Sequence, residues 1–163
     1  MYKHILIPTD GSKVSEEAAA AAIELARALG ARVTAVHVVP DSTASALDRW
    51  AHHDPKFETK LDQVFEKLGA VYLETIREVA RGAGVRCECR LLHGDSPYEA
   101  IIAASLDEGC DLVVMASHGR KGDSAGVLAS ETVKAATLGA VPVLIHKKAR
   151  AAKASPPARA RKK

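Results

Sequence analysis

The stretch DLVVMASHGRKGDSAGVLASETVKAAT, residues 111–137, decides how the rest of the chain is interpreted. It begins with the apolar run 112–115, which is short enough to be a strand buried on both faces. A loop with three glycines and two basic residues follows, and Ser130-Glu131-Thr132 then leads into a helical apolar pattern. Glycines let backbone amides approach a ligand, and the first turn of a helix offers N–H groups and a positive dipole end. The stretch therefore predicts an anion site, although it also suits a loop that merely joins a strand to a helix.

The segments on either side alternate between strand and helix patterns. Strands are predicted at 2–8, 31–39, 85–92, 112–115 and 141–145, and helices at 15–29, 57–81, 96–108 and from 130 to 138. Ser12 or Ser15 is the expected cap of the first helix. This alternation predicts an α/β fold with a parallel sheet, helices on both faces, and a ligand crevice at the carboxyl ends of the strands.

The segment His93-Gly94-Asp95-Ser96-Pro97-Tyr98-Glu99 predicts how the helix at 96–108 begins. Ser96 is the expected N-cap, Pro97 suits the first helical position, and Glu99 completes a capping box.

Composition indicates one domain of ordinary size. The chain has 163 residues and is 47% apolar, without an apolar run near the roughly 18 residues of a membrane span. The apolar run near the N-terminus is too short for a signal peptide, so a cytoplasmic protein without a membrane segment is expected.

Three cysteines fit that compartment. Cys87 and Cys89 are two residues apart in a predicted strand, which puts both thiols on one face. Apolar packing is favoured over a metal or redox role, because the sequence offers no further ligands nearby.

The adjacent His52 and His53 are interpreted as part of a solvated loop or helix edge, because sequence neighbours do not share a helix face. His93, just after a strand, is interpreted as a loop residue.

Three motifs carry a family resemblance: PTDGS near the start, GDSPYEAI in the middle, and ASHG followed nine residues later by AS. The last resembles the nucleotide-loop motif G-x-x-G-x9-G-(S/T) of the universal stress protein family. Ala116 and Ala129 stand at its first and last glycine positions, and Gly119 is retained. The resemblance covers residues 1–147.

The resemblance implies a Rossmann-like sheet of the adenine nucleotide α-hydrolase type, with strand order 3-2-1-4-5. It also implies binding of ATP with Mg²⁺, weakened by the two alanines. By position, the adenosine would contact Pro8, Thr9, Asp10 and Val38; the near wall would be Met115, Ala116, His118 and Gly119; and the phosphates would meet Ala129, Ser130, Glu131 and Thr132.

The sequence contains no Walker A motif, no G-x-G-x-x-G after the first strand and no G-x-S-x-G elbow. Asp10 is a single carboxylate without an evident partner, so no catalytic residue and no protein-held metal are predicted. Two functions stay open: a nucleotide-binding regulator of stress responses, and a dimeric family member that acts through partner proteins without nucleotide. A slow ATPase ranks third.

The family also implies a homodimer through the last strand, residues 141–145. That strand is apolar and would otherwise leave an open sheet edge. Lysine at Val143 is expected to release monomers.

The end of the chain is predicted to be a disordered basic tail, residues 148–163. Residues 147–163 hold eight basic and no acidic residues, which leaves 15 basic and 20 acidic residues, a net charge of −5, in residues 1–146. The tail has two adjacent prolines and no large apolar side chain, so it cannot form a core.

Removal of this tail is expected to leave nucleic-acid binding unchanged, because a solubilising role is favoured over contact with nucleic acid or an anionic surface. Full-length protein and a version ending at His146 are compared in a gel-shift assay at low and moderate salt. A tail-dependent shift at low salt that disappears at moderate salt would instead assign it phosphate contacts.

Overall fold

A computed structural model describes residues 1–41, 55–117 and 131–147. In chain order its elements are β1 (His4–Pro8), α1 (Lys13–Leu29), β2 (Arg32–Val39), α3 (Pro55–Gly82), β3 (Cys87–His93), α4 (Pro97–Asp107), β4 (Leu112–Ala116), α5 (Glu131–Leu138) and β5 (Val143–His146). Predicted residues that lie outside the described ranges are His52, His53, His118, Gly119, Ala129, Ser130 and the tail 148–163.

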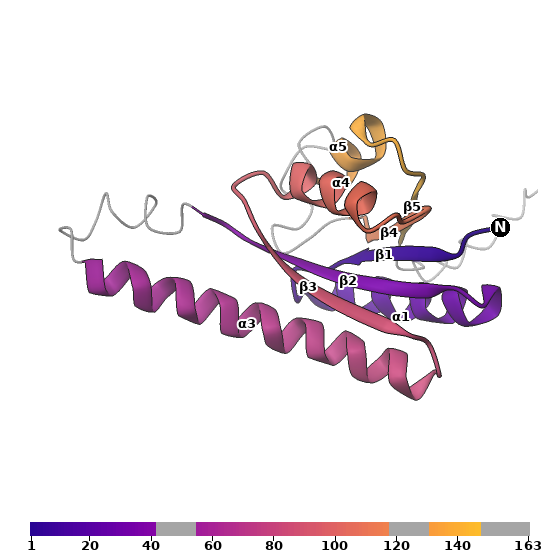
Figure 1. Cartoon of the computed structure of the whole chain (residues 1–163), viewed down its shortest axis with the longest axis horizontal. Helices are drawn as coiled ribbons and strands as arrows, with labels where there is room; N and C mark the ends of the chain where they lie inside the picture. The colour runs from indigo at the N-terminus through magenta and orange to yellow at the C-terminus, as the bar shows by residue number, and fades with distance from the viewer. Residues whose placement is uncertain (42–54, 118–130, 148–163) are drawn as a thin grey trace, which may run out of the picture.

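The strands form one sheet in the order β3-β2-β1-β4-β5 (Figure 1). Every neighbouring pair is parallel, with Ile5 opposite Val33 in β2 and opposite Leu112 in β4. The order implied by the family resemblance is thereby confirmed. The order reverses between β1 and β4, and this is where open α/β sheets bind ligands.

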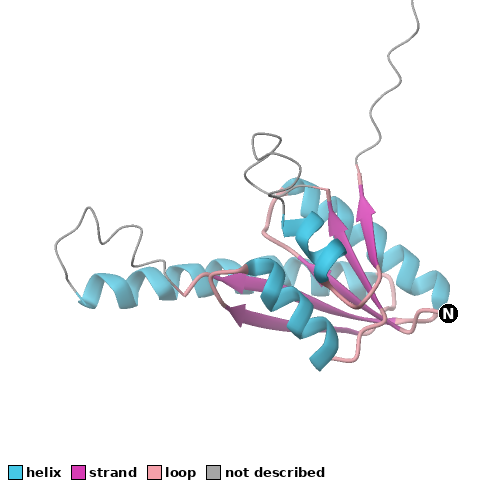
Figure 2. Ribbon diagram, turned by 90° about the horizontal axis from the view of Figure 1, so that it is seen from above, coloured by secondary structure: helices cyan, strands magenta, loops and turns pink. Residues whose placement is uncertain are grey.

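Two apolar cores lie on the two faces of this sheet. Ile5 and Ile7 of β1 point into the core under α1 and α3, whereas Leu6 points into the core under α4 and α5. This alternation along one strand explains why β1 is apolar at every central position. Figure 1 shows the two pairs of helices on opposite sides of the sheet, and Figure 2 shows the long helix α3 running past the ends of the strands.

The structure explains why two strands begin later than predicted. The strand expected at residue 85 begins at Cys87, because the Val85 N–H donates to the Ala80 carbonyl at 2.9 Å and closes the end of α3. The strand expected at 141–145 is Val143–His146; Pro142 precedes it and accepts the Val113 N–H through its carbonyl at 2.9 Å. Proline has no N–H to give to a sheet, so it marks the start of β5.

Ser12 is confirmed as the cap of α1, since its hydroxyl accepts the Ser15 N–H at 3.3 Å. The capping box predicted for α4 is wrong. The Ser96 side chain makes no capping hydrogen bond, and the Glu99 carboxylate accepts the Tyr98 hydroxyl instead. The Tyr98 N–H at the start of α4 is accepted by the Glu131 carboxylate from α5 at 2.9 Å.

Within the described ranges, no helix has the length and apolarity needed to cross a membrane.

Candidate functional site

The candidate site lies where the carboxyl ends of β1 and β4 meet. These strands are direct neighbours, so Pro8 at the end of β1 comes close to Met115 and Ala116 at the end of β4. The side chains of all three residues are buried. They can therefore form a wall of the crevice and offer backbone groups to a ligand.

The turn after β1 is held by its own side chains. The Ser15 hydroxyl donates to the Ser12 carbonyl at 2.8 Å and, having one proton, accepts from the Thr9 hydroxyl at 3.0 Å. Thr9 Oγ1 also accepts the Gly11 N–H at 3.1 Å. The Thr9 side chain is thus committed to holding the shape of the turn.

Asp10, half-buried in the same turn, accepts the Ser12 N–H through Oδ1 at 3.0 Å. This bond fixes the orientation of the carboxylate just after the end of β1, and a contact of Asp10 with the sugar or base stays a prediction.

Two residues that the sequence analysis missed support this turn. His37 Nδ1 donates to the Thr9 carbonyl at 2.7 Å, and the His37 ring meets the edge of the Tyr72 ring with centroids 5.4 Å apart. Tyr72 comes from α3 and covers Gly11, whose φ is +72°. A methyl group at residue 11 would lie 2.4 Å from the Tyr72 ring. No local pattern indicates these contacts, because they join β1, β2 and α3.

Substitution of Gly11 by alanine is expected to destabilise the protein by about 2–4 kcal/mol, from left-handed backbone strain plus overpacking against Tyr72. Gly30→Ala is the matched control: its φ is +62°, yet nothing lies within 4 Å of the added methyl group. That control should lose only about 1–2 kcal/mol. Urea unfolding measures both, and equal losses would contradict the role given to Tyr72.

Val38 offers peptide groups to the crevice. The Val36 carbonyl accepts the Thr9 N–H at 2.9 Å, so the peptide groups of Val36 face β1. Peptide groups two residues apart in a strand point the same way, and those of Val38 therefore face the same side, beyond the point where β1 ends. The Val38 side chain packs against the core under α4 and α5. Val38 thus turns an N–H and a C=O toward the space beyond the end of β1, and their use by a base stays a prediction.

The start of α5 is tied to the end of β4. The buried Thr132 hydroxyl donates to the Ala116 carbonyl at 2.9 Å. This bond holds the amino-terminal turn of α5 beside the carboxyl end of β4, where a helix favours a negatively charged group.

Glu131 is engaged by two neighbours. Its carboxylate accepts the Tyr98 N–H and pairs with Lys134 at 3.3 Å, while the Lys134 ammonium lies 4.8 Å from the centroid of the Tyr98 ring. Glu131 therefore joins α5 to α4, a role that the sequence analysis did not predict. The Lys134 charge also offsets the carboxylate near the place predicted for phosphates.

Among the described residues, no three histidine, cysteine or acidic side chains come together as a metal site.

Comparison with known proteins identifies the family of this chain. The family model of the Universal stress protein family matches residues 1–147. Universal stress protein MJ0531 of Methanocaldococcus jannaschii is 32% identical over 148 residues, covering 91% of this chain and 84% of that protein. A universal stress protein of Thermus aquaticus is 34% identical over 148 residues, covering 89% of this chain and 98% of its own length.

Solved structures share the fold. The structure of the hypothetical protein MJ0577 superposes with a TM-score of 0.74 at 26% identity, covering 93% of this chain and 99% of that one. A universal stress protein in complex with cAMP gives a TM-score of 0.67 at 22% identity, covering 89% of this chain and 97% of that one. With a family match over nearly the whole described chain and relatives above 30% identity, this chain belongs to the universal stress protein family.

Proposed function

We propose that this chain is a cytoplasmic regulatory module of a stress response that binds an adenine nucleotide, ATP with Mg²⁺, at the β1–β4 switch point. The observation that carries the proposal is the Thr132–Ala116 hydrogen bond, which holds the start of α5 at the end of β4. This places a helix N-terminus, with its preference for phosphate, beside the strand ends.

The base end of the site supports adenine. The N–H and C=O of Val38 suit the ring nitrogen N1 and the 6-amino group of adenine, which present an acceptor and a donor side by side. Guanine presents the opposite pair, a donor at N1 and an acceptor at O6. Asp10 lies two residues after the end of β1, and its carboxylate is held by the Ser12 N–H. We assign it the contact with the sugar.

The phosphate end rests on the family pattern, with Ala129, Ser130, Glu131 and Thr132 at the family's phosphate positions. Backbone amides do most of the binding in such loops, so the alanines at 116 and 129 weaken the site without removing it. His118 and Gly119 complete the proposed near wall, with Met115 and Ala116.

The structure of a universal stress protein with cAMP adds a precedent for an adenine nucleotide on this fold. That likeness concerns the fold, and cAMP is therefore included among the ligands to be tested.

Thermal unfolding tests the base preference. At millimolar concentration ATP is expected to raise the melting temperature, and GTP to raise it less, because ligand binding to the native state stabilises it. Equal shifts for ATP and GTP would contradict the role of Val38. A larger shift with cAMP than with ATP would contradict the proposed phosphate end.

The alternative function, a dimer that acts through partner proteins without nucleotide, makes a different prediction. An extract of the denatured, freshly purified protein would then contain no adenine nucleotide, and no nucleotide would change the melting temperature.

A further inference from the structure

His4, the first residue of β1, has a buried imidazole ring that the proposed nucleotide site does not use. Side chains alternate along a strand, so His4 points, like Leu6, toward the core under α4 and α5. The residue is only 4% exposed. It lies at the amino end of the sheet, whereas the nucleotide site is proposed at the carboxyl ends. A group that can gain a proton near neutral pH is therefore enclosed by the fold.

One nitrogen of this ring has a hydrogen-bond partner, and the other meets none in the described part of the chain. His4 Nε2 lies 2.8 Å from the hydroxyl of Thr34, which is itself fully buried, whereas Nδ1 is buried and unpartnered. The neutral ring suits this setting when Nε2–H donates to Thr34 and Nδ1 carries only a lone pair, because a buried N–H without an acceptor is costly. A second proton would create such an N–H at Nδ1.

The backbone of His4 is tied to the start of β4, so the ring has no free route to water. The Asp111 carboxylate accepts the Lys3 N–H at 2.7 Å and the His4 N–H at 3.0 Å. In return, the Asp111 N–H donates to the His4 carbonyl at 2.9 Å. On the other side, the Arg32 N–H of β2 donates to the Lys3 carbonyl at 3.0 Å. The ring can reach solvent only if the amino ends of these strands separate.

The charges around the ring favour its neutral form. Burial, followed by the positive charge of Arg32, lowers the pKa of His4. The Glu108 carboxylate and the backbone carbonyls of Glu108 and Gly109, at the end of α4, act in the opposite direction without restoring the usual value. The Glu108 carboxylate also accepts a hydrogen bond from Arg90 Nε at 2.9 Å, so part of its charge is compensated there.

Two other ionisable groups beside His4 do not respond to mild acid. Burial alone would raise the pKa of Asp111, but hydrogen bonds from the backbone of His4 and Lys3 outweigh it and lower the value. Burial raises the pKa of the Cys110 thiol to about 11. Asp111 therefore stays charged and Cys110 stays neutral between pH 7 and 5.5, and the histidine is the member of this group that can change its charge.

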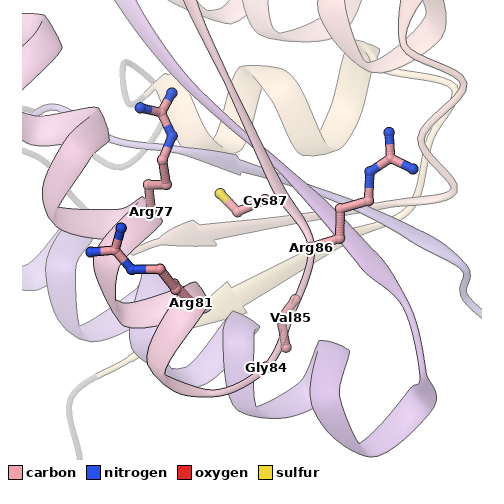
Figure 3. A pocket seen from close by; sticks show the side chains of 6 residues that line it. All are labelled: Arg77, Arg81, Gly84, Val85, Arg86 and Cys87. Carbon is pink, nitrogen blue, oxygen red and sulfur yellow. The ribbon is translucent and has the colours of Figure 1, made fainter.

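The charged cavity at the amino end of β3 is also insensitive to mild acid. Figure 3 shows Arg77, Arg81 and Arg86 around this cavity, between the end of α3 and the start of β3. Each of these arginines pairs with a glutamate, and such a pair keeps both charges in mildly acidic solution. Cys87 and Cys89 pack against the core under α3, as the sequence analysis predicts.

We propose that His4 is a built-in sensor of mild acid, which on taking up a proton loosens the amino ends of β1 and β4 and lowers the stability of the fold. The neutral ring fits its site beside Thr34 with one hydrogen bond. The charged ring would lack an acceptor at Nδ1 and would be cut off from water, and a buried charge without partners is strongly unfavourable. Separation of the strand ends relieves that cost by admitting water.

The sign and the range of the response follow from this difference. In the unfolded chain a histidine takes up its proton near pH 6.5, whereas the fold resists that uptake by lowering the pKa of His4. The contribution of His4 to stability should therefore be constant above about pH 6.5 and should fall as the pH decreases below it. Between pH 7.5 and 5.5, one such histidine raises the equilibrium constant for unfolding by at most about tenfold.

Urea unfolding of the full-length protein at pH 7.5 and 5.5 tests this response. His4→Gln removes the titrating group and keeps a side chain that can hydrogen-bond to Thr34. The unfolding constant of the wild type is expected to rise several-fold more on acidification than that of His4→Gln. His93→Gln is the matched control, because the His93 ring is half-exposed and lies 3.9 Å from the carboxylates of Asp41 and Glu66. This control should keep the acid response of the wild type.

Magnetic resonance of the wild-type protein tests the same claim without a variant. The titration midpoint of the His4 ring is expected below pH 6.5. Hydrogen exchange at pH 7.5 and 5.5 tests the place of opening: the Asp111 N–H, bound to the His4 carbonyl, should lose several-fold more protection than the Thr9 N–H, bound to the Val36 carbonyl.

Three results would overturn the proposal: equal acid responses of the wild type and His4→Gln, a His4 midpoint at or above pH 6.5, or equal losses of protection at Asp111 and Thr9. The last two are measured on the wild type, so they decide the matter even if His4→Gln does not fold.

Discussion

Replacing Leu144 with lysine is expected to convert a dimer of this protein into monomers. β5 is an edge strand of the described sheet, and the side chains of Leu144 and Ile145 are 42% and 38% exposed on it. We propose that two copies pair antiparallel through β5, which makes the interface self-complementary about a two-fold axis.

Leu144 is a sharper position for this test than Val143. Val143 packs against the core under α4 and α5, so lysine there would also damage the fold. Lysine at residue 144 would place two like charges beside the two-fold axis, one from each copy. This should weaken the free energy of dimerisation by several kcal/mol, and the dissociation constant of the dimer should therefore rise more than about a hundredfold.

Light scattering at micromolar concentration measures the mass of each variant. Val71→Lys is the control, because Val71 is 61% exposed on α3, which packs on β2 and β3 at the other edge of the sheet. A wild-type protein that is already monomeric, or a Leu144→Lys variant that stays dimeric, would refute this interface.

The second large effect is expected at residue 129. Ala129→Gly should tighten ATP binding about tenfold if the loop requires a left-handed backbone at residue 129, because that conformation costs alanine about 1–2 kcal/mol. Ser130→Ala should weaken binding by a similar factor, because a hydrogen bond to a charged group contributes about 1.5–3 kcal/mol.

Titration calorimetry with ATP and Mg²⁺ measures both variants. Ala140→Gly, a change at an exposed residue just before β5, is the control and should leave the affinity unchanged. Unaltered affinity in both Ala129→Gly and Ser130→Ala would mean that the loop motif is not used for phosphates.

Most of the fold could be predicted from local patterns. Alternating apolar strands and capped helices predict every described element to within a few residues, and the local serine signal narrows the cap of α1 to Ser12 or Ser15, of which Ser12 is the one used. The order of the strands came from the family resemblance, since periodicity does not encode which strands are neighbours. Ser96 holds the predicted N-cap position, but its side chain makes no capping hydrogen bond; the Tyr98 N–H is accepted instead by Glu131, 33 residues further along the chain.

The candidate site was predictable only in part, for the same reason. Strand ends such as Pro8 and Ala116 are read from local pattern, and the sheet order then brings them together. The hydroxyls of Thr9 and Thr132 are used by the protein itself, and His37 and Tyr72 reach the site from other elements. Such contacts depend on tertiary packing, which the sequence pattern does not specify.

Calorimetric titration of the wild-type protein with ATP and Mg²⁺ tests the central claim most directly. The nucleotide site proposed at the β1–β4 switch point predicts a saturable heat with one nucleotide per chain, weak enough to need high micromolar to millimolar ATP. Absence of heat together with an unchanged melting temperature at millimolar ATP would contradict the site and leave the nucleotide-independent dimer as the function of this protein.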